Sequence, residues 1–196
     1  MRRYKLLGKF LSLILRHDPA RVGINLRSDG YVSIRLLAEK ISAINRFSWV
    51  NEESILKAAK LDEKDRFEIT EMSGELYIRA RYGHNKNLGV KIDYPEVRKG
   101  EIKLLYHGTE EKNIQPILRN GILPMDRIYV HLSATIRDSV EVAKRRKGRP
   151  VVVVVDADRM IGDGYFIYRA TKRVYLTKFV PPMYIIKTIK NIDRLL

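Results

Sequence analysis

The chain has 196 residues, enough for one large domain or for two small lobes that each bury a core. It has no cysteine and no apolar run near the ~20 residues that span a bilayer, which excludes structural disulfides, thiol catalysis, cysteine-ligated metals and membrane-spanning helices. Positions 1–100 hold 20 basic and 13 acidic residues and the remainder 18 and 10, so the net charge of +15 covers both halves and favours a polyanionic partner such as nucleic acid.

The first half of the sequence predicts three helices followed by two strands. Pro19 ends the first apolar helical pattern, and Ser33 is suited to cap the second helix. The predicted elements are a helix ending near Arg16-His17, a helix after Ser33, a helix over Glu52 to Lys60, and strands over Arg66 to Ile69 and Leu76 to Arg79, joined at Ser73-Gly74. This order is typical of a winged-helix lobe, which we place at residues 1–90.

A winged-helix lobe often inserts a helix into a DNA groove, so a DNA-binding regulator is one interpretation. The third predicted helix, however, begins with Glu52 and Glu53 and offers a poor surface for reading bases. Basic groups gather elsewhere, near the end of the first helix and on the hairpin, and they could grip one phosphate. These candidates are Arg16, His17, Arg66, Arg79 and, just beyond the hairpin, His84. Taken alone, the arginines and His17 are more simply explained as solvated surface charges, and His84 as an exposed loop histidine.

The stretch from Arg81 to Glu101 is rich in turn residues and marks a domain boundary. The second lobe, residues 91–196, then mixes helices with dominant strands, so the whole chain is α+β. We predict strands over Ile102 to Tyr106, Ile128 to Leu132, Val151 to Val155, Gly164 to Tyr168, Val174 to Thr177 and Met183 to Ile189, with helices around Ile114 to Leu118 and Val140 to Ala143.

A nucleotide pocket is predicted in this second lobe. His107-Gly108-Thr109 follows an apolar run, and a small polar turn there would bring backbone N–H groups and an imidazole against a ligand. His131, Leu132 and Ser133 end a second strand, and a basic cluster over residues 144–149 lies between a helix and a central strand. Neither a Gly-x-Gly-x-x-Gly motif nor a P-loop is present, so a Rossmann or P-loop mode of binding is not indicated.

Taken together, these motifs resemble the RNA 2′-phosphotransferases, which remove the splice-junction 2′-phosphate from tRNA using NAD. The resemblance covers nearly the whole chain. It rests on Leu11 to His17, Asp29 to Val32, Arg66-Phe67, Ile78 to Ala80 with Gly83-His84, Tyr106 to Thr109, Val130 to Ser133, and Val174 to Leu176 with Val180-Pro181. The family pairs a winged-helix lobe with an ADP-ribosyltransferase-like lobe.

The resemblance implies a catalytic set of Arg16, His17, Arg66 and Arg146. The first three would bind the 2′-phosphate. Arg146 would stabilise the transition state of the second of the two reaction steps described below. NAD would be held by the His107-Gly108-Thr109 and His131-Leu132-Ser133 segments, and no metal is implied. In the implied reaction the 2′-phosphate first attacks the nicotinamide ribose and expels nicotinamide. A ribose hydroxyl then attacks that phosphate, releasing 2′-OH RNA and ADP-ribose 1″,2″-cyclic phosphate.

The sequence departs from the family pattern at three places, one of which is Asn85, where serine commonly follows Gly-His. Where the family has Val-Gly-x-Arg-His-Gly, this chain has Lys144 to Gly148 with arginines at both 145 and 146. Where the family has Ser-x-Asn-x-Val-Trp, it has Ala170-Thr171-Lys172-Arg173-Val174-Tyr175.

Other interpretations of the second lobe remain open, above all an ADP-ribosyltransferase that acts on nucleic-acid terminal phosphates or on protein. Such enzymes commonly use an activating glutamate, and none occurs from Pro150 onward. A phosphate acceptor needs no such base. We therefore expect a cytoplasmic, monomeric enzyme that consumes NAD and acts on RNA bearing a 2′-phosphate, with tRNA as the expected substrate.

Overall fold

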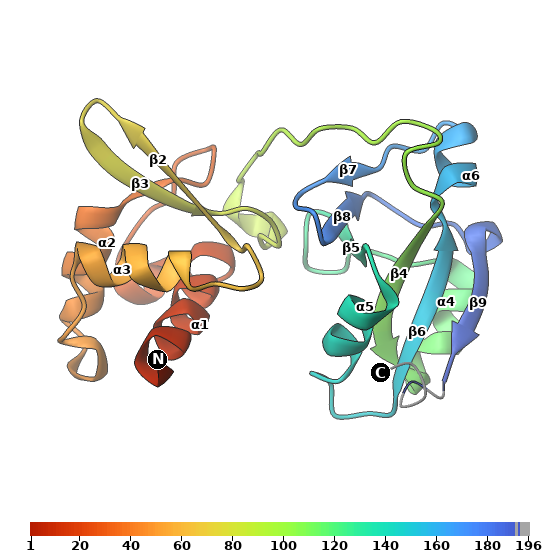
Figure 1. Ribbon diagram of the computed structural model, residues 1–196, viewed down its shortest axis with the longest axis horizontal. Helices are drawn as coiled ribbons and strands as arrows, with labels where there is room; N and C mark the ends of the chain where they lie inside the picture. The colour runs from red at the N-terminus through yellow and green to blue at the C-terminus, as the bar shows by residue number, and fades with distance from the viewer. Residues whose placement is uncertain (191, 193–196) are drawn as a thin grey trace. The chain divides into compact units, whose positions relative to one another are not determined.

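The computed structural model describes residues 1–190 and 192, and the chain divides into two compact units, Met1–Asp93 and Tyr94–Leu196 (Figure 1). The first unit contains α1 (Arg2–Arg16), η1 (Pro19–Val22), β1 (Val32–Ser33), α2 (Ile34–Ser42), η2 (Asn45–Phe47), α3 (Glu52–Lys60), β2 (Phe67–Met72), β3 (Glu75–Ala80) and η3 (Lys86–Leu88). The predicted three helices and hairpin are thus present, with boundaries close to those expected from the sequence.

Local chemistry explains these boundaries. The side chain of Ser33 accepts a hydrogen bond from the Leu36 N–H and so caps α2, as predicted. Asn51 and Ser54 form a reciprocal capping box at the start of α3. Ser73 and Gly74 both have positive φ, 52° and 79°, which is the conformation that a two-residue hairpin turn requires.

The core of the first unit lies between the helices and a three-stranded antiparallel sheet of order β1-β3-β2. The three helices and three strands all contribute apolar side chains to one cluster, among them Leu7, Leu11, Ile14, Leu15, Ile34, Leu37, Ile55, Phe67 and Ile78. This packing fixes the end of α1 against the base of the hairpin, where the predicted phosphate-binding residues lie.

The second unit is built on a six-stranded sheet of order β7-β8-β5-β4-β6-β9, in which all neighbours are antiparallel. Its elements are β4 (Leu104–Glu110), η4 (Glu111–Asn113), α4 (Ile114–Asn120), β5 (Val130–Ser133), α5 (Ile136–Ala143), β6 (Pro150–Asp156), α6 (Ala157–Gly162), β7 (Tyr168–Arg169), β8 (Val174–Thr177), η5 (Pro182–Tyr184) and β9 (Ile185–Ile189). The mixed helix and strand content predicted for the chain is confirmed. None of the helices in the described part of the chain is long and apolar enough to cross a bilayer.

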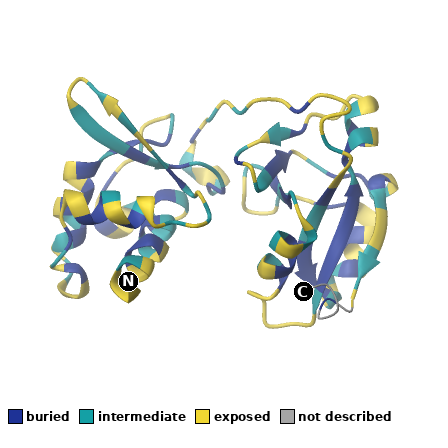
Figure 2. Ribbon diagram, viewed as in Figure 1, coloured by how far each residue is buried: buried dark blue, intermediate teal, exposed yellow. Residues whose placement is uncertain are grey.

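β6 is an interior strand, paired with β4 and β9, as its five valines predict. Val151, Val153 and Val155 face one apolar cluster, while Val152 faces another that includes Val140 of α5. Figure 2 shows the strand buried along its length. A run that is apolar at every position is expected where both faces of a strand are covered.

The prediction that His107-Gly108-Thr109 forms a turn is wrong, because the tripeptide lies within β4. Gly108 pairs with Val152 of β6 in the ladder. A Cβ on Gly108 would lie 2.0 Å from the carbonyl oxygen of Ser139. Glycine is needed at position 108 because α5 packs closely on the strand. The backbone does not turn there.

Other elements of this unit also differ from the prediction. Of the strand expected over Gly164 to Tyr168, only Tyr168 pairs, and β7 extends to Arg169. Pro182 starts a 3₁₀ turn over the first part of the expected last strand, so β9 begins at Ile185. Helix α6 was not predicted, although Asp156 caps it through the Arg159 N–H.

Candidate active site

Arg16 and His17 end α1 beside the segment that follows the hairpin. The Arg16 guanidinium carbon lies 4.4 Å from the ring centre of Tyr82, and the Arg16 carbonyl accepts a hydrogen bond of 2.8 Å from the Asn85 N–H. Gly83 adopts φ +89° against the Arg16 side chain, a conformation that L side chains rarely adopt. The guanidinium is therefore held in place by an aromatic face and by the local backbone.

His84 is a buried imidazole in a positively charged setting. It is 3% exposed, and its Nε2 has no hydrogen-bond partner among residues 1–190 and 192. Burial, together with the charges of Arg16, Arg79 and His17, lowers the pKa of His84 to about 4. His84 is therefore neutral at physiological pH, and one ring nitrogen is left to interact with a ligand.

Arg79 is held by several groups at once. Its Nε donates to Glu68 at 2.9 Å, its Nη1 donates to the Asp29 carbonyl at 3.0 Å, and its guanidinium stacks over Tyr31 at 4.4 Å. The side chain is 17% exposed. Arg79 thus fixes the Asp29-Gly30 turn and contributes charge to the cluster, with few donors left for a substrate.

Arg66 precedes β2 and is oriented by Asp62, a residue that the sequence analysis missed. The Arg66 Nε donates to Asp62 at 2.9 Å, Nη2 contacts the same carboxylate, and the Arg66 backbone N–H donates to it at 2.7 Å. Asp62 is 5% exposed at its side chain, so this partner is nearly buried. The only sequence signal was an acidic residue four positions before the arginine.

Four of the predicted residues, Arg16, His17, Arg79 and His84, form one electrostatic cluster in the first unit. The Arg66 side chain lies beside α1. Its Nη2 would be 3.6 Å from a Cβ on Gly8, a residue of α1 that lies about two turns before Arg16. The cluster is cationic, and guanidinium and imidazole groups are suited to binding a phosphate.

In the second unit, His107 of β4 is locked by the neighbouring strand. Its Nδ1 donates to the His131 carbonyl at 3.0 Å, which leaves Nε2 with a lone pair in the neutral ring. Burial, followed by the charges of Arg146 and Arg127, lowers the pKa of His107, while the hydrogen bond to His131 opposes this shift. A neutral imidazole therefore lies in a cationic environment.

The other residues of the predicted nucleotide segments are mostly structural in their side chains. Thr109 is 2% exposed and its hydroxyl accepts a hydrogen bond of 3.1 Å from Asn113. Leu132 belongs to the apolar core, and Ser133 is buried opposite Tyr106 in the ladder. Gly108 presents backbone alone.

The basic loop 144–149 is exposed, and Glu110 anchors it to β4. The Glu110 carboxylate accepts a hydrogen bond of 3.1 Å from the Gly148 N–H and pairs with Lys112 at 3.0 Å. Of the two arginines left open by the sequence, it is Arg146 whose charge acts on His107. The anchoring role of Glu110 was not predicted. The only sequence feature that pointed to it was its position directly after His107-Gly108-Thr109.

Comparison with known proteins decides the family. A sequence model described as "RNA 2′-phosphotransferase, Tpt1 / KptA family" matches residues 2–179. The chain belongs to this family. It is 39% identical over 180 residues to a probable RNA 2′-phosphotransferase of Pyrococcus abyssi, covering 91% of this chain and 92% of that protein. It is 36% identical to one from Acaryochloris marina, covering 93% and 96%.

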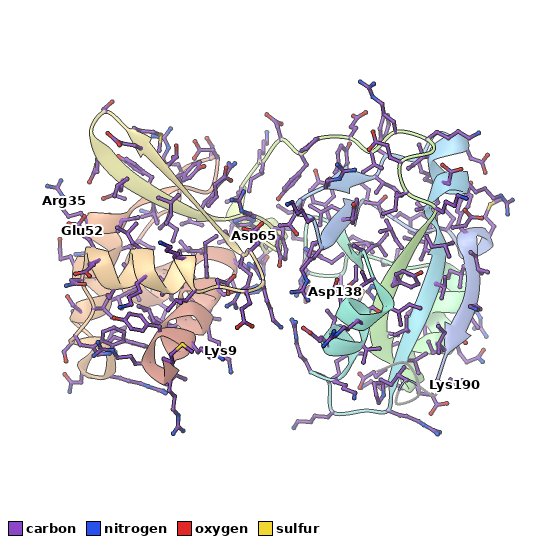
Figure 3. All side chains as sticks on the ribbon, in the orientation of Figure 1. Lys9, Arg35, Glu52, Asp65, Asp138 and Lys190 are labelled. Atoms are coloured by element: carbon purple, nitrogen blue, oxygen red, sulfur yellow. The ribbon has the colours of Figure 1, made fainter. Side chains whose placement is uncertain are left out.

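A further archaeal relative belongs to the same group. Archaeoglobus fulgidus has a protein named probable RNA 2′-phosphotransferase 1, which is 39% identical over 93% of this chain and 80% of its own length. Membership in the family makes the chain a transferase, as predicted. The alternative of a DNA-binding regulator is thereby set aside. This agrees with the exposed Glu52 and Glu53 in the first turn of α3; Figure 3 labels Glu52.

Against this family background, the departure at residues 170–175 forms a tight turn before β8. The hydroxyl of Thr171 accepts hydrogen bonds from the N–H groups of Arg173 and Val174, each at 3.1 Å. Arg173 in turn binds Asp138 of α5. The changed residues therefore maintain a defined connection between α5 and β8.

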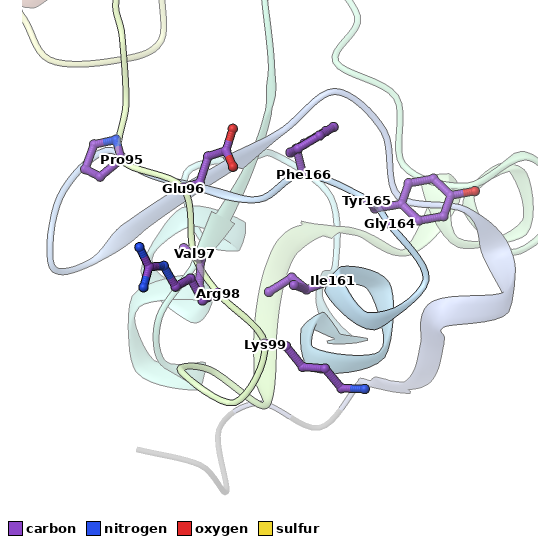
Figure 4. A pocket seen from close by; sticks show the side chains of 9 residues that line it. All are labelled: Pro95, Glu96, Val97, Arg98, Lys99, Ile161, Gly164, Tyr165 and Phe166. Carbon is purple, nitrogen blue, oxygen red and sulfur yellow. The ribbon is translucent and has the colours of Figure 1, made fainter.

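A surface pocket of about 610 Å³ in the second unit contains none of the predicted site residues (Figure 4). It is lined by Pro95 to Lys99, Ile161 and Gly164 to Phe166. We find no group of three or more histidine, aspartate or glutamate side chains placed to hold a metal within the described residues.

Proposed function

We propose that this family member removes an internal 2′-phosphate from RNA and transfers it to NAD. The products are RNA with a free 2′-OH, nicotinamide and ADP-ribose 1″,2″-cyclic phosphate. The observation that carries the proposal is the cluster at the end of α1, where the charges of Arg16, His17 and Arg79 act on a buried, neutral His84. The printed names of the relatives support RNA as the substrate, and we propose tRNA as the physiological one.

In the first unit, the cationic groups hold the phosphate. Arg16, fixed on Tyr82, and Arg66, fixed by Asp62, present guanidinium donors in set orientations, and His17 is exposed beside them. Phosphoryl transfer depends mainly on positioning and charge stabilisation, which such groups provide. The neutral Nε2 of His84 adds a hydrogen bond without adding charge.

In the second unit, the chemistry of the donor set fits a dinucleotide. His107 offers a neutral ring whose tautomer is fixed by the His131 carbonyl. Arg127 and Arg146 suit the anionic pyrophosphate. NAD, when bound, supplies the ribose that accepts the phosphate. We assign Arg146, on the loop anchored by Glu110, to stabilising charge on that phosphate.

The test uses purified protein and an RNA with a single internal 2′-phosphate, incubated with and without NAD. Mass analysis of the RNA and of the small molecules should show loss of one phosphate only with NAD, together with nicotinamide and the cyclic product. Intact substrate with folded protein would overturn the proposal. Modification of an RNA end alone would redirect it to ADP-ribosylation of terminal phosphates.

A further inference from the structure

One face of α1 carries a row of basic residues. Arg2, Lys5, Lys9, Ser12 and Arg16 are spaced by three, four, three and four residues, which places them on one side of an α-helix over about 21 Å. The opposite side, with Leu7, Leu11, Ile14 and Leu15, is fully buried. We call the polar side, from Arg2 to Arg16, the α1 stripe.

The lysines of the α1 stripe lack the carboxylate partners that several other cations of this unit have. Arg21 pairs with Asp18, Arg27 with Asp29, Arg35 with Glu75 and Lys40 with Glu39. Lys5 and Lys9, by contrast, are exposed and form no ion pair with any residue that the structure describes. Figure 3 shows Lys9 on α1.

The charge pattern of α1 also opposes the stability of the helix. The helix has five basic residues and no acidic one, and Arg2, Arg3 and Lys5 lie in its first turns. Positive charge near a helix N-terminus is unfavourable by about 0.3–1 kcal/mol per group, because the macrodipole is positive there. An anionic ligand along this face would offset that cost.

The stripe leads directly to the proposed phosphate-binding residues. Arg16 is its last member and is also part of the cluster around His84. Gly8, beside the stripe, leaves room for the Arg66 guanidinium. A strand whose 2′-phosphate lies at Arg16 would therefore meet Lys9, Lys5 and Arg2 in turn.

We propose that the α1 stripe binds the backbone phosphates of the RNA strand that flanks the 2′-phosphorylated nucleotide. This inference rests on the proposed function for its substrate. It names Lys5 and Lys9 as residues that bind RNA without taking part in the chemistry. Because they contact phosphates and no bases, the contact is independent of sequence.

The test compares Lys5→Gln/Lys9→Gln with a matched control, Arg35→Gln/Lys40→Gln, which removes two charges from α2. Each protein is assayed on a 2′-phosphorylated dinucleotide and on a long single-stranded RNA with one internal 2′-phosphate. We expect the α1 variant to raise KM for the long RNA about tenfold at low salt, to leave kcat unchanged and to leave the dinucleotide unaffected. The control should match the wild type on both substrates.

Binding of the long RNA, measured against salt without NAD, tests the stripe apart from catalysis. Two phosphate contacts at about 0.7 each should make the slope of log K against log salt about 1.4 less steep in the α1 variant. An unchanged slope, or an equal change in the α2 control, would overturn the proposal that the α1 stripe binds RNA. Failure of the wild type to act on either RNA, with the slope difference intact, would instead overturn the proposed function.

Discussion

His84 is a buried imidazole that stays neutral because its surroundings oppose a positive charge. In the unfolded chain the pKa of a histidine is near 6.5, whereas in the folded protein the pKa of His84 is about 4. Between these values the unfolded state binds a proton that the folded state does not bind. Stability must therefore fall as the pH decreases through this window.

We expect His84 to contribute a loss of free energy of unfolding on the order of 3 kcal/mol between pH 6.5 and 4. His84→Asn keeps a polar group of similar size and cannot gain the charge, so its stability should fall less over that range. Urea unfolding of both proteins at several pH values measures the difference. If the free energy of unfolding falls equally with pH in both proteins, protonation of His84 is not the cause of the loss.

Arg145 and Arg146 are both exposed, and the charge of Arg146, together with that of Arg127, contributes to lowering the pKa of His107. We expect Arg146→Ala to slow the second step and to accumulate RNA that carries ADP-ribose on its 2′-phosphate. Arg145→Ala is the matched control and should not accumulate it. Mass analysis of the RNA over time distinguishes them, and the reverse pattern would move the catalytic role to Arg145.

Among the elements, the packing of α5 on β4 shapes the proposed nucleotide site. The Gly108 backbone lies so close to Ser139 that any side chain would clash with helix backbone. The same helix leads into the loop that Glu110 anchors through Gly148. The position of Arg146 thus depends on how the strand and helix fit together.

Gly108→Ala should therefore destabilise the protein by about 1–3 kcal/mol, because backbone atoms cannot move away as a side chain can. Gly8→Ala is the control in α1. Its Cβ would meet only Arg66 Nη2, at 3.6 Å, and helix propensity favours alanine by about 0.8–1 kcal/mol. Chemical unfolding should rank Gly8→Ala at or above the wild type and Gly108→Ala well below it. Equal stabilities would refute the close-packing explanation.

For the molecule as a whole, the two units have separate cores. The cluster around Leu11 and Ile78 draws only on residues before Asp93, and the clusters around β6 draw only on residues after it. Each unit thus buries its own apolar surface, which is the main driving force for folding.

A fragment of residues 1–93 should consequently fold alone. Trp49, the only tryptophan, packs edge-on against Tyr4 at 5.5 Å and provides a fluorescence signal for this unit. We expect a cooperative thermal transition by both fluorescence and circular dichroism. A fragment without a cooperative transition would show that the first unit depends on the second.

The sequence by itself predicted most of the helices and strands in their order, and it named candidate catalytic groups whose roles remain a prediction. Helical spacing in α1, the cap at Ser33 and the valines of β6 are local signals, and each acts through neighbours in the chain. The motifs that run from Arg16 to Val180 were also enough to indicate the family.

The tertiary structure alone decided what these groups contact. Gly108 was read as a turn residue because glycine permits many backbone conformations, and only the approach of α5 shows why it is needed. Asp62 and Glu110 gave almost no sequence signal, since an acidic residue acquires a role only when folding brings an arginine or a loop N–H against it. Likewise, the burial that lowers the pKa of His84 is a property of packing across distant segments, which no local pattern encodes.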